Sequence, residues 1–181
     1  IMLNKNYKVY LLTSVTNDIG GLQEITYVAS TEIDNTGDDD DEDLNFNMWL
    51  IETKTDSSGQ TEATTTYTYD GGYYDRDEEE FRGFYYVIED IDDVMHLEHY
   101  YHQDAILQGK EEKATVSDTN EQLYQKTEYL WNYTEQDEYA IVFLEQETKT
   151  LYNPDDKGEY KSTTTSYTYD TYGNVELISY A

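Results

Sequence analysis

Short runs of alternating apolar and polar residues recur along most of the chain, and turn-forming residues separate them. The runs are rich in β-branched and aromatic side chains, which fit a pleated sheet. The pattern predicts an all-β fold of about ten to twelve long antiparallel strands and hairpins, with little or no helix. The run 139–147 is the most apolar, and we expect it to be the most buried. We expect strands at 7–15, 22–30, 47–55, 61–69, 81–88, 94–101, 114–116, 122–131 and 139–147.

The stretch from Tyr67 to Phe84, YTYDGGYYDRDEEEFRGF, joins two of these runs through an acidic segment. Gly71 and Gly72 supply the backbone freedom of a turn or bulge, because glycine adopts positive φ without a Cβ penalty. Arg82 lies between the acidic residues and an expected turn at Gly83-Phe84. A guanidinium there can pair two carboxylates through its fork and pin the loop to the sheet. Contact with a partner is the alternative role for this arginine.

One hairpin recurs within the chain. The segment 52–55 (ETKT) is identical to 147–150, and 65–70 (TTYTYD) matches 165–170 (TSYTYD). The second copy has a longer loop, 151–161, which contains the only proline, Pro154. A difference confined to the loop is expected when each copy is a supersecondary unit that stacks on its neighbours. We therefore predict related hairpins at about 47–70 and 140–170 within a single β-rich segment spanning 1–181.

Charge narrows the set of partners. The formal net charge is −29, from 40 acidic and 11 basic residues. Such a surface repels nucleic-acid phosphates and anionic membranes, so we predict neither nucleic-acid binding nor membrane contact. A basic partner is compatible with it. Low hydrophobicity with high net charge also characterises disordered chains, but these are poor in aromatic residues, and 15% of this chain is aromatic. We therefore expect a folded protein with a heavily solvated surface.

Tyrosine sets the character of the apolar positions. The chain has 21 Tyr and 4 Phe, so many aromatic faces carry a polar tip suited to half-exposed sites. It has no cysteine, which excludes disulfides and leaves the redox compartment open. We find no pattern of a signal peptide or a membrane span. Because the sequence begins at Ile1 in the middle of a pattern, we expect a fragment of a longer exported polypeptide.

Two groups of residues are candidates for metal binding. The run 34–43 (DNTGDDDDED) is a solvated acidic loop or, alternatively, a calcium site within Asp38 to Asp43. An EF-hand needs Gly at its sixth position and Glu at its twelfth, and Gly37 falls too early for a loop that starts at Asp34. His96, His99 and His102 recur every third residue. On a strand, His99 faces away from the other two, so the three cannot converge on one ion. We predict no metal and no cofactor.

Catalytic patterns are weak. Carboxylates are abundant, notably from Asp75 to Glu80, but glycosidase chemistry needs one defined pair across a cleft. The nucleophile motif G-x-S-x-G does not occur, and there is no cysteine nucleophile. We predict that the chain is not an enzyme.

Several motifs together carry a family resemblance. The segment 169–174 (YDTYGN) resembles a YD repeat of the RHS type, whose motif runs Y-x-Y-D-x-x-G-N/R. An ordered series that includes 11–15, 17–21, 25–27, 66–69, 71–75, 80–84, 102–103 and 109–110 resembles the middle region of SpvB/TcaC-type proteins. These are the B components of bacterial insecticidal toxin complexes. The residues on which we place the structural motif are Gly71, Gly72, Tyr73, Tyr74, Asp75, Phe81, Arg82, Gly83, Phe84, Tyr169, Asp170, Gly173 and Asn174.

The resemblance implies a strip of an RHS/YD-repeat β-shell. In that family the shell encloses a toxic C-terminal domain, and a β-propeller attaches it to the pore-forming component. Expected partners are neighbouring segments of the same shell, the propeller, the pore-forming component and the enclosed toxin, and the expected location is extracellular. No catalytic residues are implied for this segment. The chain departs from the family in its acidity and at 44–47, where LNFN replaces L-P-F-P.

Two other hypotheses remain open at the level of the sequence. One is an extracellular binding or adhesion module that uses calcium at Asp38 to Asp43. The other explains the acidity as adaptation to salt, which is compatible with either function. If the carboxylates line the inner face of a shell, they would also attract a basic, partly unfolded cargo.

Overall fold

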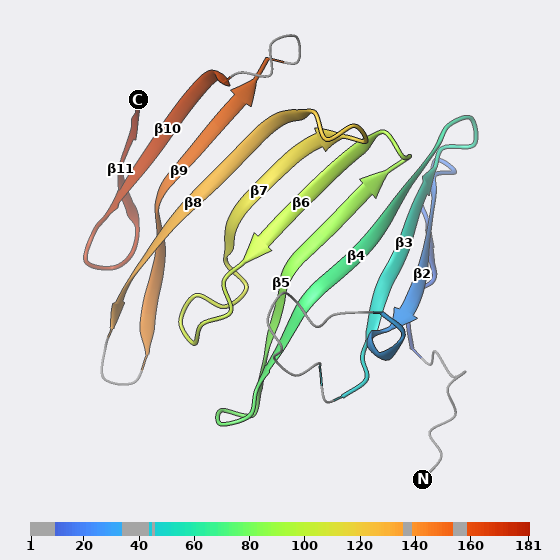
Figure 1. Cartoon of the computed structure of the whole chain (residues 1–181), viewed down its shortest axis with the longest axis horizontal. Helices are drawn as coiled ribbons and strands as arrows, with labels where there is room; N and C mark the ends of the chain where they lie inside the picture. Colours follow the sequence, from blue (N-terminus) through green and yellow to red (C-terminus); the bar gives the residue numbers. More distant parts are fainter. Residues whose placement is uncertain (1–9, 34–43, 45, 136–138, 154–158) are drawn as a thin grey trace.

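The computed structural model describes residues 10–33, 44, 46–135, 139–153 and 159–181. Within these residues, eleven strands form one antiparallel sheet whose spatial order is the chain order, with a single short 3-10 turn, η1 (Ser30–Glu32) (Figure 1). The all-β prediction is confirmed. The strands are β1 (Ser14–Thr16), β2 (Leu22–Ala29), β3 (Trp49–Ser57), β4 (Glu62–Asp75), β5 (Glu80–Ile91), β6 (Met95–Tyr101), β7 (Glu111–Asp118), β8 (Leu123–Glu135), β9 (Ala140–Tyr152), β10 (Glu159–Tyr169) and β11 (Val175–Tyr180).

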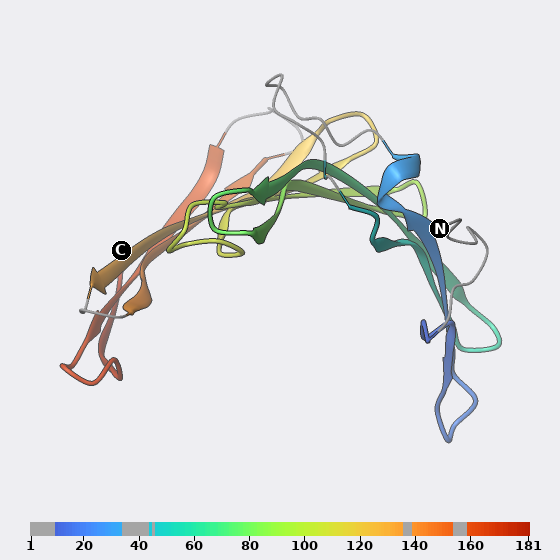
Figure 2. The same ribbon diagram turned by 90° about the horizontal axis from the view of Figure 1, so that it is seen from below.

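The sheet bends into an arch (Figure 2). Each strand hydrogen-bonds its neighbours in the sequence, so the sheet is open, and β1 and β11 are its two edges. Twist and coiling accumulate from strand to strand because neighbouring strands rotate in a fixed sense. An arch with two open edges leaves backbone groups at both ends without strand partners within the described sheet.

Most predicted strands occur, and several are longer than expected. The predicted hairpin around Asn17–Gly21 is confirmed by the pairing of β1 with β2, although β1 is only three residues long. The charged turn expected at Glu89–Asp93 is shorter, because β5 continues to Ile91. Likewise β7 continues to Asp118, beyond the predicted turn start at Ser117. Polar residues join these strands because backbone pairing with a neighbour outweighs their weak intrinsic preference.

Of the turn or bulge expected at Gly71 and Gly72, the turn is absent. Both glycines lie inside β4, which runs unbroken to Asp75 and pairs with β5 along this length. Gly71 has φ +60°, and a Cβ on Gly72 would lie 2.9 Å from Phe84 Cε1. Because Gly72 has no Cβ, the ring of Phe84 can lie directly against β4.

The turn expected at Gly83-Phe84 is also absent. Both residues lie within β5, and the register against β4 shifts between Tyr73 and Tyr74 because Arg82 is an extra residue. Gly83, with φ +91°, allows this bulge. The turn of this hairpin is the acidic segment between Asp75 and Glu80, as the sequence predicted.

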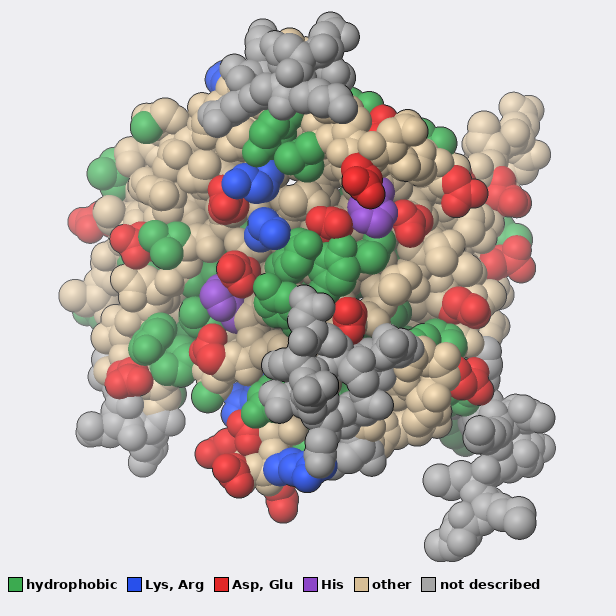
Figure 3. All heavy atoms as spheres, viewed as in Figure 1, with side chains coloured by type: hydrophobic (Ala, Val, Ile, Leu, Met, Phe, Trp, Pro, Cys, Tyr) green, Lys and Arg blue, Asp and Glu red, His purple; other side chains and the backbone are tan. Residues whose placement is uncertain are grey.

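The buried apolar core lies near the N-terminal side of the sheet. Leu44 and Phe46, which precede β3, pack with Leu50 and Phe84. In Figure 3, hydrophobic side chains gather near the middle of this face, and charged side chains are spread around them. The prediction that 139–147 would be the most buried run is wrong, since Ile141 remains 37% exposed. A single-layer sheet buries apolar residues only where another segment covers them.

Candidate structural site around Arg82

Arg82 is the most buried charged side chain of the described chain, at 4% exposure. Its Nη2 donates to Asp75 Oδ2 at 3.3 Å, and its Nη1 lies 3.1 Å from Glu80 Oε2. Nη1 also donates to Gln108 Oε1 at 3.1 Å, whereas Nε has no partner. The guanidinium thus joins the two ends of the β4–β5 hairpin turn to the segment between β6 and β7.

Two glutamines complete this connection. Gln108 Nε2 donates to Glu80 Oε1, and Gln103 Nε2 donates to the carbonyl oxygens of Gly71 and Gly83 at 2.7 and 2.9 Å. Both glycines have positive φ. Gln103 therefore binds the backbone at the two positions, Gly71 and Gly83, where the β4–β5 pair is irregular. Sequence reasoning placed Gln103 in the resemblance without assigning it a role, and it missed Gln108, because neither contact follows from local spacing.

Asp75 also organises the acidic turn itself. Its Oδ1 accepts hydrogen bonds from the backbone N–H groups of Glu78 and Asp77. These bonds, together with Arg82, lower the pKa of Asp75. The carboxylate is held in its charged form, which suits a structural anchor better than a proton donor.

The aromatic residues of the predicted motif lie in different surroundings. Tyr74 and Phe81 contact the ring of Phe46 edge-on, with centroid separations of 5.5 and 5.7 Å. Phe81 also contacts Phe84. Tyr73 points away from this cluster and is 39% exposed. The structure therefore brings Tyr74, Phe81 and Phe84 together and leaves Tyr73 outside.

The YD-like segment forms the β10–β11 turn. Asp170 Oδ1 accepts from the N–H groups of Tyr172 and Asn174, while Asn174 Nδ2 donates to Asp170 Oδ2. Gly173 adopts φ +83°, as this turn requires. The hydrogen bonds from Asn174 lower the pKa of Asp170. The first and last polar residues of the motif thus close one turn together.

Among the residues that the structure describes, the same turn occurs twice more without the YD sequence. Asn17 accepts from the N–H groups of Ile19 and Gly21, and Asp118 accepts from those of Asn120 and Gln122. The fourth residue has positive φ in each turn: Gly20 in the first and Glu121 in the second. Glu121 is therefore a strained substitute for glycine.

In each copy of the repeated hairpin, a tyrosine lies just beyond the last paired residues, where the two strands separate. The β3–β4 ladder ends at Thr53–Thr66, and beyond it Tyr69 Oη donates to the carbonyl of Ile51 at 2.9 Å. In the second copy, Tyr169 Oη donates to the carbonyl of Leu144 at 2.7 Å. Burial raises the pKa of Tyr69 to about 12, so this phenol remains a donor. The hydroxyl satisfies a carbonyl that the separating strands leave unpaired.

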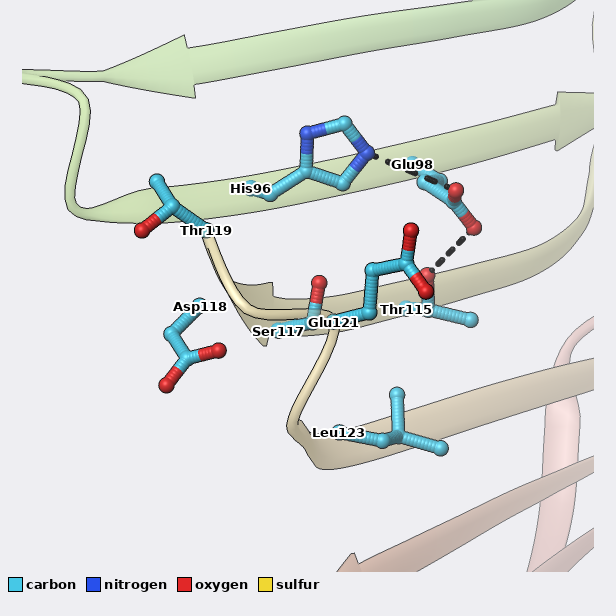
Figure 4. Close-up of a pocket in the computed structure, with 8 residues that line it drawn as sticks. All are labelled: His96, Glu98, Thr115, Ser117, Asp118, Thr119, Glu121 and Leu123. Atoms are coloured by element: carbon cyan, nitrogen blue, oxygen red, sulfur yellow. Dashed lines mark hydrogen bonds and ion pairs between the residues drawn. The ribbon is translucent and has the colours of Figure 1, made fainter.

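His96 belongs to a polar network on β6. Its ring lies between Asp90 Oδ1 at 2.7 Å and Glu98 Oε1 at 3.4 Å, and Glu98 also accepts from Tyr86 and Thr115. Burial lowers the pKa of His96, but the two carboxylates outweigh burial and leave it raised. Figure 4 shows His96 and Glu98 beside Thr115. These residues line a cavity of about 540 Å³.

His99 lies on the opposite side of β6, because alternate strand residues face opposite ways. It pairs with Glu111, which raises the pKa of His99. Among the described residues, no group of three or more acidic, histidine or cysteine side chains could hold a metal ion. The acidic run 34–43 lies outside the described residues, so the alternative of a calcium site at Asp38 to Asp43 stays a hypothesis. No described helix is long and apolar enough to cross a membrane.

The chain matches the model of a known family. The family described as insecticide toxin TcdB middle/N-terminal region matches residues 2–109, more than half of the chain. The chain belongs to this family. The family segment extends through β6 to the glutamines that hold the Arg82 site, whereas the YD-like turn lies beyond it. No curated protein sequence matches the chain.

Solved structures of toxin complexes share the fold. The crystal structure of TcdB2-TccC3 has a TM-score of 0.71 at 14% identity, over 91% of this chain and 12% of the matched chain. The Photorhabdus luminescens Tc holotoxin pore, with a TccC3 mutation, has a TM-score of 0.71 at 14% identity, over 93% and 12%. For TcdB2-TccC3-Cdc42 the values are 0.64, 13%, 87% and 11%. The chain thus spans about an eighth of these proteins, and at such identity the likeness concerns the fold alone.

Proposed function

We propose that the chain is a strip of the wall of a toxin-complex β-shell, which encloses a C-terminal toxin or effector. The observation that carries this proposal is the arched, single-layer sheet with two open edges (Figure 2). A strip of a hollow wall has this shape, because the sheet must bend around a space and continue into further strands. Membership of the TcdB middle/N-terminal family and the fold shared with TcdB2-TccC3 support it.

The C-terminal edge is built for continuation. All six residues of β11 are exposed, including Leu177 at 58% and Ile178 at 44%. Apolar side chains on both faces of an edge strand are costly in water and favour an additional strand and neighbouring layers. The other edge, β1, is short, as protected edges commonly are.

The partners follow from the shell. Neighbouring segments of the same protein would pair with the edges, and the enclosed toxin would lie inside. The shell would connect through a β-propeller to a pore-forming component. The fold shared with a Tc holotoxin pore supports a place in a toxin complex. The whole complex would act outside the producing cell. The segment itself would be a non-enzymatic single β-rich unit, in which Arg82 and the YD-like turn fix hairpin geometry.

Hydrogen exchange at the edge tests this function. Thr164 and Ala181 exchange reciprocal backbone hydrogen bonds, so by alternation the N–H groups of Ile178 and Tyr180 point away from β10. In the 181-residue chain these two amides should exchange rapidly, whereas in the full-length protein they should be protected at least about a hundredfold.

The amide of Ser179 points toward β10 and is the internal control, because it should be protected in both proteins. Equal, rapid exchange of Ile178 and Tyr180 in the two proteins would contradict continuation of the sheet.

A further inference from the structure

In the centre of the sheet, three tyrosine–glutamate pairs lie directly across neighbouring strands. Tyr67 is opposite Glu89 on β4–β5, Tyr101 is opposite Glu111 on β6–β7, and Tyr129 is opposite Glu147 on β8–β9. Directly opposite residues share a face of the sheet. Every second strand junction in the centre of the arch therefore carries a phenol beside a carboxylate.

The strand register joins the pairs into one stripe: Glu89 lies opposite Leu97, and Tyr101 lies four positions farther along the same strand, so these residues share a face. Burial, Glu111 and Glu89 raise the pKa of Tyr101, and burial together with Glu111 and Glu147 raises the pKa of Tyr129 to about 12. Burial and Glu147 also raise the pKa of Tyr167 on β10. We call this set the Tyr–Glu stripe; its members are Tyr67, Glu89, Tyr101, Glu111, Tyr129, Glu147 and Tyr167.

The stripe carries three carboxylates and little positive charge, with Lys54 close to its Tyr67–Glu89 end. Within the described part of the chain, neither Glu89 nor Glu147 forms an ion pair, and Glu111 pairs with a histidine. All seven members, Tyr167 included, are only partly exposed, so their side chains are held in place before any ligand arrives. Fixed carboxylates between aromatic rings attract guanidinium and ammonium groups by charge and by cation–π contact.

The protein already uses this chemistry internally. Lys113 Nζ lies 3.7 Å from the ring centroid of Tyr100, and Lys110 Nζ lies 5.2 Å from that of Trp131. Lys113 and Tyr100 are not members of the stripe. Lys110 lies beside it, because it precedes Glu111 and because Trp131 Nε1 donates to the carbonyl of Glu111. An external cation would find in the stripe the same kind of ring, with a carboxylate beside it.

We propose that the Tyr–Glu stripe binds a basic, extended polypeptide segment. From β4 to β10 the stripe crosses six strand spacings, roughly 29 Å at about 4.8 Å per spacing. An extended chain of about nine residues covers this length. The net charge of −29 favours such a partner at long range, while the stripe gives it a defined place. The inference rests on the proposed function only for the identity of the polypeptide, which would be unfolded cargo of the shell.

Fluorescence anisotropy with the folded 181-residue chain tests the binding. The probe is a labelled peptide of about ten residues with alternating Arg and Ser, and the comparison peptide has Glu in place of Arg. The Arg peptide should bind and lose affinity as salt rises, and the Glu peptide should not bind. Glu89→Gln combined with Glu147→Gln should weaken binding about tenfold, since two fixed charges are lost.

A matched variant separates the stripe from the overall charge. Asp93→Asn with Glu112→Gln removes the same two charges at exposed positions outside the stripe and should change affinity less than about twofold. Tyr129→Leu keeps the charge and should weaken binding about threefold through loss of a ring. Circular dichroism verifies that each variant is folded.

Two results would overturn the inference: no binding of the Arg peptide, or equal weakening by both charge variants. Either result leaves the exchange experiment on β11 unaffected. Conversely, unprotected β11 amides in the full-length protein together with stripe-specific peptide binding would contradict the shell proposal and support the binding surface.

Discussion

The two copies of the repeated hairpin differ in burial because they lie in different surroundings. Near the first, formed by β3 and β4, Leu44 and Phe46 cover the sheet, and Leu50 and Phe84 are buried. In the second half of the described chain, the buried residues are instead Ser117, Thr127 and Thr150. Apolar sequence alone did not decide where a core forms. The presence of a covering segment did, because one sheet layer cannot bury its own faces.

The hairpins also differ in register. Thr53 pairs with Thr66 in the first copy, whereas the equivalent Thr148 pairs with Thr164, two residues away from the position that the repeat would predict. A shift of two preserves which face each side chain occupies. The threonine hydroxyls therefore still meet across the strands, as in Thr55–Thr64 and Thr148–Thr164.

The largest expected loss of stability is in the half of the sheet that Leu44 and Phe46 cover, and it should exceed the loss in the uncovered half. Phe84→Ala should lower the free energy of unfolding by about 3–4 kcal/mol, because it empties the space between Leu44 and β4. Phe143→Ala, which removes the ring beside Tyr169 in the second copy, should cost about 1–2 kcal/mol. Urea denaturation of both variants checks the difference, and equal costs would break the comparison.

Arg82→Ala should destabilise the first half by about 2–3 kcal/mol. The cost is below that for a fully buried ion pair because Asp75 and Glu80 regain water once the arginine is gone. Arg82→Lys should recover only part of the loss, since an ammonium cannot bridge Asp75, Glu80 and Gln108 at once. Thermal unfolding measures both variants. Unchanged stability in Arg82→Ala would show that the segment between β6 and β7 is held without it.

Tyr69→Phe and Tyr169→Phe should have similar effects, about 1 kcal/mol each, because each removes one hydroxyl-to-carbonyl hydrogen bond at the point where its hairpin opens. Denaturant titration of the two single variants gives the comparison. A cost confined to Tyr69 would mean that the hydroxyl matters only where the core covers it.

The smallest expected effect is a gain. Glu121→Gly should stabilise the β7–β8 turn by about 0.5–1 kcal/mol, because it relieves a non-glycine residue at φ +62°. Gly173→Ala in the YD-like turn should cost a similar amount for the reverse reason. Differential scanning calorimetry can resolve both shifts in melting temperature. If both substitutions destabilise, the two turns do not share one backbone requirement.

Several features of the site could be foreseen from the residues. Asp170, Gly173 and Asn174 form the turn that their spacing indicates, because an Asx side chain and a glycine at fixed offsets are local requirements. The fork of Arg82 between carboxylates was also a local expectation. Its contact with Gln108, and the contacts of Gln103 with Gly71 and Gly83, join residues far apart in the chain. No local pattern encodes such pairs.

By itself the sequence determined an all-β chain of hairpins, because alternation, β-branched and aromatic residues and turn residues act within a few positions of one another. It also determined the acidity and the family. Only the tertiary structure decided that Gly71 and Gly72 lie within a strand, that Phe84 fills the space above them, and that the apolar run in β9 stays partly exposed. Those outcomes depend on which segments meet across the sheet, and the curvature and register that bring them together arise from the whole set of strands.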